Sequence, residues 1–202
     1  MKKFIIKYNV ELFTVLVLLL TLIDCILYSG ISPFRKLINL FLILGVLHEW
    51  EEKRFPGGFF ELMANKLGIK AEREIFDRGG LIVVLYWIVI TSIPYLFDQH
   101  TFLVLVPVVL GLFEAFVHTM GIFIHKMKKP YTPGLITAWI MAFASVYTIW
   151  YLESKGLVTT GDYLLGVVLM IGSFILMDIA IFRTIGLSPA QMKEKVKLLT
   201  KK

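Results

Sequence analysis

The chain has 202 residues, of which 57% are hydrophobic and only 18% are charged. Soluble globular domains average about 45–50% apolar and about 25% charged residues, so this composition excludes an ordinary soluble domain and indicates a membrane protein. The net charge is +6, but the basic residues lie between apolar runs, so we expect no nucleic-acid partner. The length fits a single domain over residues 1–202.

Apolar runs long enough to cross a membrane, which takes about 20 residues, recur along the chain. They predict an all-α membrane helix bundle with six transmembrane helices. The first run lacks a small-residue cleavage site, so we interpret it as a retained helix and not as a signal peptide. The second is the shortest in apolar length, and Ser32 and Pro33 predict its start. The six approximate ranges are 10–29, 34–53, 80–97, 101–126, 134–152 and 162–184.

The positions of Lys and Arg predict the orientation of these helices. Six spans place both termini on one side of the membrane. All of the 21 basic residues except Arg35, Lys36 and Lys155 fall on that side. Because basic residues concentrate in cytoplasmic segments, we expect an integral, multi-pass protein of the cytoplasmic membrane with both termini in the cytoplasm.

Two further amphipathic segments are predicted on the cytoplasmic side. After the turn FPGG, the segment GFFELMANKLGI places Phe59, Phe60, Met63 and Leu67 on one helical face. This pattern is typical of a short helix lying in the membrane interface between the second and third spans. The basic segment 189–202 is predicted to be a cytoplasmic amphipathic tail that rests on anionic lipid.

The second span ends in the motif HEWEE. His48, Glu51 and Glu52 stand at positions i, i+3 and i+4, so they share one helix face, whereas Glu49 points elsewhere. Ligands one helical turn apart are typical of zinc sites and of the carboxylate–histidine pairs of di-iron bundles. The alternative is a charged helix end at the membrane interface, paired with the basic residues 53–54.

The fourth span carries a second set of metal-type side chains. Glu114, His118 and His125 stand at i, i+4 and i+11, which places them within about 40° of one another on the helix surface. His118 and His48 both lie in the cytoplasmic half of their spans, so the two sets are expected at a similar depth. His125 is about 10 Å from His118 along the axis, so one ion cannot easily bind both. Its alternative is an interfacial histidine.

Together these residues predict a divalent metal site. Two imidazoles and several carboxylates suit one zinc ion with a general base, or a pair of iron or manganese ions, and the abundance of carboxylates favours the pair. Catalytic roles are expected for Glu52 as a base, for Tyr131 as a donor to a bound group, and for Asp178 as a ligand, a partner of a ligating histidine or a proton carrier. The predicted ligands are His48, Glu51, Glu52, Glu114, His118 and His125.

Four segments in this order resemble the HXXEE-domain membrane proteins, which are small prokaryotic multi-span proteins. The segments are HEWEE, RFPGGF, EAFVH and PYTPGLITA, and the similarity runs from about residue 36 to about residue 180. The family motif corresponds here to His48, Glu51 and Glu52. The resemblance implies a metal-dependent membrane enzyme and does not specify a reaction.

We therefore expect a membrane-embedded metal-dependent enzyme that acts on a lipid or another hydrophobic small molecule at the cytoplasmic leaflet. It would be a hydrolase with metal-activated water or a di-metal oxidoreductase. A metal-ion or proton transporter is the first alternative, because ionisable groups inside spans also suit a relay. A non-catalytic scaffold, in which the polar cluster only holds helices together, is the second.

Overall fold

Helices make up all of the regular structure. The computed structural model describes residues 1–27, 30–66, 68, 72–124, 126–184 and 186. Within these residues there are eight α-helices and no strand, so the predicted all-α class is confirmed. In chain order they are α1 (Lys2–Lys7), α2 (Asn9–Ile26), α3 (Pro33–Lys53), α4 (Phe59–Lys66), α5 (Arg73–Leu96), α6 (Thr101–Ile124), α7 (Leu135–Ser154) and α8 (Thr160–Thr184).

Five of these helices, namely α2, α5, α6, α7 and α8, are long and apolar enough to cross a membrane. They indicate a multi-pass membrane protein. The helix α3 has 21 residues but ends in the charged motif. Its start is as expected, since the Ser32 side chain accepts a hydrogen bond from the Arg35 amide and Pro33 opens the helix. The helix α5 begins at Arg73 instead of 80, because a polar stretch extends the helix beyond its apolar run.

The short helix predicted in the long connection is present as α4, and α1 was not predicted. Leu67, His125 and the basic tail 189–202 lie outside the described residues.

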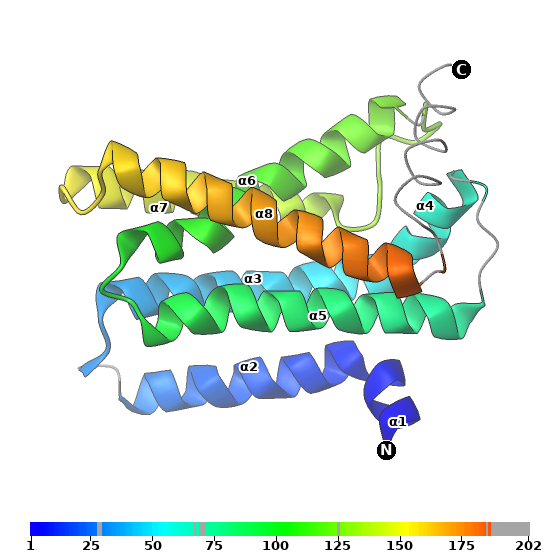
Figure 1. Ribbon diagram of the computed structural model, residues 1–202, viewed down its shortest axis with the longest axis horizontal. Helices are drawn as coiled ribbons and strands as arrows, with labels where there is room; N and C mark the ends of the chain where they lie inside the picture. The colour runs from blue at the N-terminus through cyan, green and yellow to red at the C-terminus, as the bar shows by residue number, and fades with distance from the viewer. Residues whose placement is uncertain (28–29, 67, 69–71, 125, 185, 187–202) are drawn as a thin grey trace.

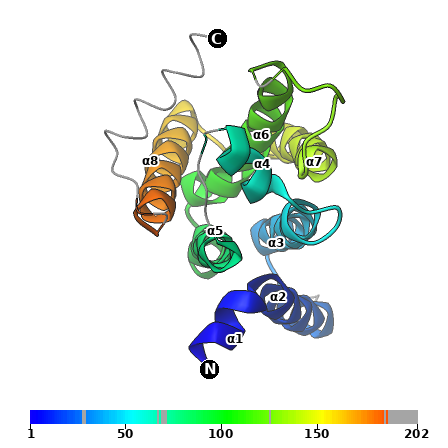
Figure 2. The same cartoon turned by 90° about the vertical axis from the view of Figure 1, so that its right-hand side faces the viewer.

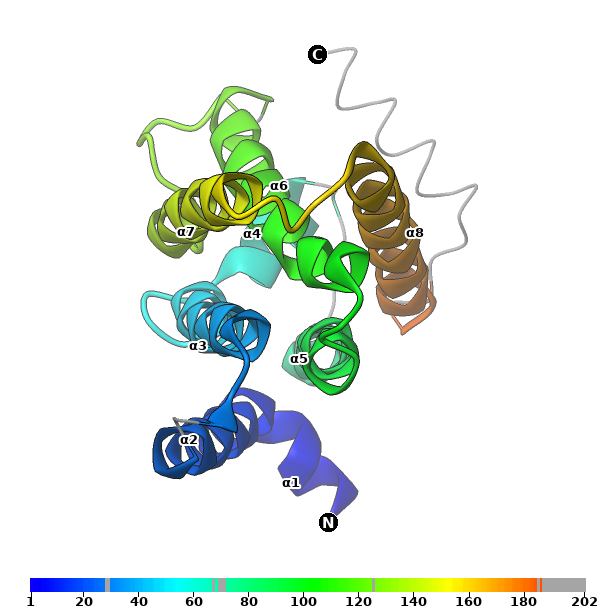
Figure 3. The same cartoon turned by 90° about the vertical axis from the view of Figure 1, so that its left-hand side faces the viewer.

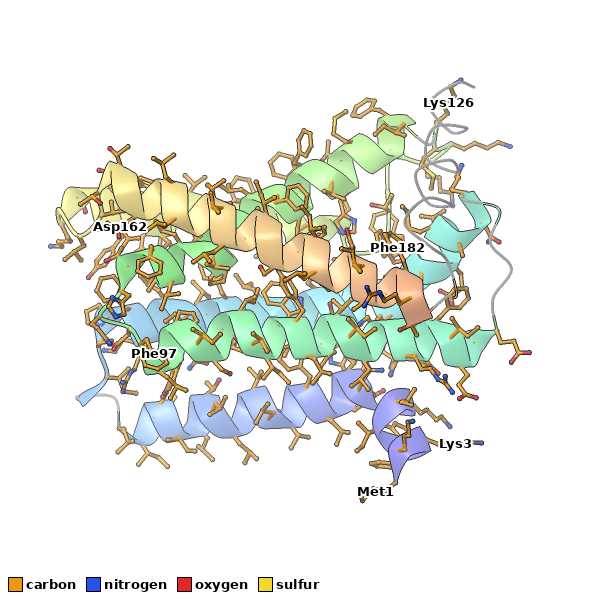
Figure 4. All side chains as sticks on the ribbon, in the orientation of Figure 1. Met1, Lys3, Phe97, Lys126, Asp162 and Phe182 are labelled. Atoms are coloured by element: carbon orange, nitrogen blue, oxygen red, sulfur yellow. The ribbon has the colours of Figure 1, made fainter. Side chains whose placement is uncertain are left out.

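The long helices form three layers (Figures 1, 2 and 3). The helix α2 lies on one face of the α3–α5 pair, and α6, α7 and α8 cover the other face. The helix α3 contacts α2, α4, α5, α6 and α7, so it lies in the interior of the bundle. Figure 4 places Lys3, Lys126 and Phe182 at one end of the bundle and Phe97 and Asp162 at the other. The chain therefore reverses direction from one long helix to the next.

A polar network joins α2, α3 and α5 at the end of the bundle opposite to the HEWEE motif. The Asn39 amide donates to Asp24 Oδ2 at 2.9 Å. The Thr21 hydroxyl donates to Asn39 Oδ1 at 3.2 Å, and the Tyr95 hydroxyl donates to Asp24 Oδ1. Both Asp24 and Asn39 are buried. Hydrogen bonds of this kind between buried side chains hold neighbouring membrane helices together.

Glycines allow the closest contacts between helices of the upper layer. A Cβ atom at Gly166 of α8 would lie 2.7 Å from Leu105 Cβ and 3.2 Å from the Phe102 carbonyl oxygen of α6. A Cβ at Gly111 of α6 would lie 3.2 Å from the Met141 carbonyl oxygen of α7. Small residues at such contacts let helix backbones approach and pack in a membrane, where apolar side chains gain nothing by leaving lipid.

Replacing Gly166 by alanine is expected to destabilise the bundle, since the added methyl group must push α8 away from α6. Overpacking of this kind costs about 1–3 kcal/mol, which thermal unfolding in detergent, followed by circular dichroism, detects as a lower midpoint. Gly172 lies on the same helix, and a Cβ there meets nothing within 4 Å. Gly172→Ala is therefore the matched control. If both variants unfold at the wild-type temperature, the close contact does not contribute to stability.

Candidate metal centre

The charged end of α3 lies inside the protein. His48, Glu49, Glu51 and Glu52 are 2%, 0%, 7% and 6% exposed. A helix end that merely met solvent at the membrane surface would expose these side chains, so that alternative is excluded. Burial of ionisable groups requires partners, since desolvated charge without compensation is costly. The partners come from several other helices.

His48 and Glu52 of α3 converge with His118 of α6. One ligand atom from each of these three buried residues lies within 4.8 Å of the others. His118 Nε2 is 3.1 Å from Glu52 Oε1, and His48 Nε2 is 3.6 Å from the same oxygen. Glu114 adds its Oε2 atom at 3.8 Å from His48 Nε2 and 3.7 Å from His118 Nε2. Two imidazole nitrogens and two carboxylates, brought by two helices as predicted, therefore face a common point.

These separations fit the coordination shell of a single divalent cation. Ligand atoms at about 2.0–2.1 Å from a tetrahedral zinc ion stand about 3.3–3.4 Å apart. The nitrogen–oxygen distances of 3.1–3.8 Å lie on both sides of that value. In addition, His118 Nε2 is buried and has no hydrogen-bond partner in the described part of the chain. A group formed by His48, Glu52 and His118 could thus hold a metal ion.

Hydrogen bonding fixes the tautomer of His48. Its Nδ1 lies 2.9 Å from Thr137 Oγ1. The Thr137 hydroxyl has two acceptors within reach, Glu51 Oε2 at 2.6 Å and the Gly134 carbonyl oxygen at 3.2 Å. A hydroxyl has a single proton, so Thr137 must accept from His48 Nδ1–H. In the neutral ring the Nε2 lone pair then faces two carboxylates, an arrangement that requires a cation between them, either a proton or a metal ion.

Glu51 was predicted to be a ligand, but the structure directs both of its oxygens to the start of α7. Oε2 accepts from the Thr137 amide at 2.8 Å, and Oε1 accepts from the Ile136 amide at 3.2 Å and from the Tyr131 hydroxyl at 2.9 Å. The first amides of a helix have no partner within the helix, and Gly134, the N-cap of α7, has no side chain to offer them. Glu51 supplies this cap from another helix, and it thereby positions Thr137 for His48.

Tyr131 lies outside the cluster of ligand atoms and contacts Glu51. Burial, together with the hydrogen bond to Glu51, raises the pKa of Tyr131 to about 12. The hydroxyl therefore stays protonated at neutral pH and serves as a donor. Its acceptor here is a glutamate, and its predicted donation to a bound group stays a prediction.

The turn before α7 brings the backbone against the cluster. Gly134 has a φ of 97°, and a Cβ there would lie 2.5 Å from His118 Cε1 and 2.8 Å from Glu52 Cγ. A glycine at position 134 therefore lets the chain approach the two side chains. Beside it, Thr132 Oγ1 lies 3.0 Å from His118 Nδ1. The two threonines that contact the histidines, Thr132 and Thr137, were not predicted. The signal was present as hydroxyl residues on both sides of the Pro-Gly turn in PYTPGLITA.

Two other residues lie around the cluster without joining it. Asp178 of α8 is half-buried and is not part of the group of ligand atoms, although it is close enough to Glu114 to interact with it electrostatically. Phe59 opens α4 and packs against His118, with 5.0 Å between ring centroids and 42° between the ring planes. The helix α4 therefore covers the His118 side of the cluster, and Figure 2 shows this helix between α6 and α3.

The fold and the site define a multi-pass, all-helical membrane protein with a buried histidine–carboxylate cluster. The chain belongs to the family described as proteins of unknown function with an HXXEE motif, which matches residues 39–151. That range contains the end of α3, the cluster residues of α6 and the turn before α7. The family resemblance is thus confirmed. No curated protein and no solved structure matches the chain.

Removing the Thr137 hydroxyl is expected to weaken metal binding, because His48 loses the acceptor that holds its ring. Loss of an outer partner of a ligating histidine typically lowers metal affinity about 10–100-fold. Competition with a zinc chelator, using purified Thr137→Val in detergent, measures the change. Thr137→Ser keeps the hydroxyl and is the matched control. Equal zinc affinity in the two variants would show that this hydrogen bond does not support the site.

Proposed function

We propose that this protein is a membrane-embedded, zinc-dependent hydrolase that acts on a lipid or a similar hydrophobic substrate. The observation that carries the proposal is the convergence of His48, Glu52 and His118 from two helices. Buried ionisable residues within membrane helices are costly and usually functional. At the opposite end of the bundle, the hydrogen bond between Asn39 and Asp24 joins two helices with a single acid and no imidazole. A cluster of imidazoles and acids is better explained by a cation and its chemistry.

One ion is favoured over two. A di-metal centre needs bridging carboxylates, and Glu51, the third acid of the predicted set, has both oxygens occupied at α7. Of the residues that remain, the two histidines and Glu52 form a common catalytic zinc set with an open position. When bound there, zinc would supply Lewis acidity and would make water a better nucleophile at neutral pH.

The roles of the two remaining cluster acids follow from their exposure. The Glu52 side chain is 8% exposed and lies nearest to His118, so we assign it as a ligand. The Glu114 side chain is 16% exposed and lies 3.7–3.8 Å from both histidines. It is placed to accept a proton from an attacking water and to return that proton to the leaving group. Phe59, which covers His118, limits the access of bulk water.

We further propose that α3 is the sixth span of a single membrane domain whose two termini are cytoplasmic. With 21 residues and about 1.5 Å per residue, α3 is about 32 Å long, which matches the hydrocarbon core of about 30 Å. Its charged end is buried against protein and not against lipid. The basic residues then place the cluster in the cytoplasmic half, where membrane lipids of the inner leaflet are the available substrates.

Transport is less well supported because no continuous line of polar side chains runs along α3. Between Asn39 and His48, residues 40–47 read LFLILGVL and contain no polar side chain. Phe41, Leu42 and Val46 of this stretch are buried against other helices. An ion path along the centre of the bundle would require polar groups or water here. The polar network around Asp24 and the cluster at His48 are therefore separate features.

Metal analysis of the detergent-purified protein tests the proposal. We expect about one zinc ion per chain, and at least a tenfold weaker affinity in His48→Ala and His118→Ala, because each substitution removes a ligand. His100→Ala is the matched control, since His100 is exposed and far along the chain from the motif. Mass-spectrometric metal analysis after dialysis against a defined zinc buffer gives the stoichiometry.

The same metal analysis distinguishes the proposed metal ligand, Glu52, from the proposed proton acceptor, Glu114. Glu52→Gln is expected to lose metal, whereas Glu114→Gln is expected to retain it, because a proton acceptor need not coordinate the ion. Unchanged metal content in both histidine variants would contradict the proposal and would favour a non-catalytic scaffold.

Cysteine labelling tests the six-span topology. In a Cys25→Ser background, Gly30→Cys, just before α3, is expected to react with a membrane-impermeant maleimide in intact cells, because six spans place it outside. Phe55→Cys, just after α3, is expected to react only after permeabilisation. Both positions are exposed in the structure. If the two positions label alike in intact cells, the assignment of α3 as a span is wrong.

A further inference from the structure

We propose that a cleft among α2, α3, α4 and α5 binds the phosphate-bearing headgroup of a lipid and presents it to the cluster. This inference rests on the proposed function and names the class of its substrate. The cleft and the open solvent at its mouth together make up about 340 Å³ of atom-free space. Its lining contains Glu52, which also faces both histidines, so the cleft adjoins the cluster. The other lining residues are Asn9, Lys53, Arg54, Phe60, Glu61, Arg73, Phe76, Asp77 and Gly80.

The cleft contains one cationic side chain that has no ion-pair partner among the described residues. Lys53 is paired with Glu49 and donates to the Gly80 carbonyl oxygen at 2.8 Å. Arg54 binds both oxygens of Glu11, at 2.7 and 3.0 Å. Arg73, at the start of α5, is exposed, and no ion pair involves it within the part of the chain that the structure describes. A guanidinium group offers the planar, paired donors that suit a phosphate group.

A buried acceptor in the same cleft lacks a donor. Asn9 is 2% exposed. Its side-chain nitrogen donates to the carbonyl oxygens of Ile6, at 2.6 Å, and Asp77, at 3.4 Å. Its Oδ1 has no hydrogen-bond partner. Buried polar atoms are nearly always satisfied, so an unsatisfied oxygen on a residue that lines the cleft indicates a ligand with a hydrogen-bond donor. A headgroup hydroxyl or ammonium provides that donor.

The remaining lining sets the chemical class of the ligand. Glu61 and Asp77 disfavour a purely anionic ligand but accept hydrogen bonds from the same hydroxyl or ammonium group. Phe60 and Phe76 provide an apolar wall. The chemistry that satisfies all of these residues is a phosphodiester that also carries a donor group, as in a glycerophospholipid. The acyl chains of such a molecule stay in the bilayer beside the apolar helices.

The helix α4 connects the cleft with the cluster. Its first residue, Phe59, packs against the His118 ring, and its next residues, Phe60 and Glu61, line the cleft. Figure 2 shows α4 between α6 on one side and α3 and α5 on the other. A headgroup in the cleft would therefore lie beneath the same short helix that covers the histidines, with Glu52 between the two.

Headgroup binding by the full chain in a nonionic detergent tests the inference. The probes are dihexanoylphosphatidylglycerol, dihexanoylglycerol, which lacks the phosphate, and glycerol 3-phosphate, which lacks the acyl chains. Titration calorimetry is expected to show saturable binding of the first and at least tenfold weaker binding of the other two. Arg73→Gln should weaken binding of the phospholipid about five- to tenfold, since it removes a charged phosphate contact. Arg78→Gln is the matched control, because Arg78 is exposed on the same helix and pairs with Glu74 outside the cleft.

A variant that is expected to strengthen binding shows that the changes in affinity do not come from a general loss of fold. Glu61→Gln removes a negative charge from the cleft and is expected to strengthen phospholipid binding two- to threefold. Equal binding of dihexanoylglycerol, equal binding of glycerol 3-phosphate, or equal effects of the two arginine variants would overturn the inference. Zinc content is measured on the same samples. Full zinc without headgroup selectivity would reject the cleft alone, whereas headgroup selectivity without zinc would reject the proposed hydrolase and leave the cleft as a lipid-binding site.

Discussion

A run of polar side chains, residues 48–54, is buried or half-buried inside a bundle of apolar helices, and each of them needs a partner from elsewhere. Breaking one partner of a buried charged pair typically costs about 3–5 kcal/mol, so the positions of the surrounding helices are tied to this segment. Contacts from this run reach every long helix except α8. Trp50 and Arg54 bind Thr14 and Glu11 of α2, and Lys53 binds the Gly80 carbonyl of α5. Glu51 binds the amides of Ile136 and Thr137 of α7, and Glu52 lies against His118 of α6.

This constraint divides the motif into two functions. His48 and Glu52 turn toward α6 and form the cluster with His118. Glu51 shares their helix face but caps α7 instead, and through Thr137 it determines which nitrogen of His48 faces the cluster. The first glutamate of the motif is thus a positioning residue and the second a candidate ligand. The close approach of Gly134 completes the arrangement, since any side chain there would occupy the space of His118.

The helices were predictable because burial in lipid demands long apolar runs, and such runs are visible in a single sequence. Five of the predicted spans are helices long and apolar enough to cross a membrane, and α3 and α4 were found where periodicity placed them. The joint depth of His48 and His118 was also predictable, since helical rise converts sequence position into depth. The ion pair of Glu49 with Lys53 was not predicted, because Glu49 lies on another face than the motif residues. Lys53 also donates to the Gly80 carbonyl oxygen of α5, a distant segment that the sequence does not indicate.

The sequence by itself determined that this protein is a helical membrane bundle with imidazoles and carboxylates on two helix faces at one depth. Apolar length and helical spacing are local properties, so each can be derived from neighbouring residues. Only the tertiary structure decided which of those groups meet. Glu51 is withdrawn from the cluster by two amides at the start of α7, and Asn9 is left with an unsatisfied oxygen. Such outcomes depend on competition among donors and acceptors from distant segments, which is settled only when the helices pack.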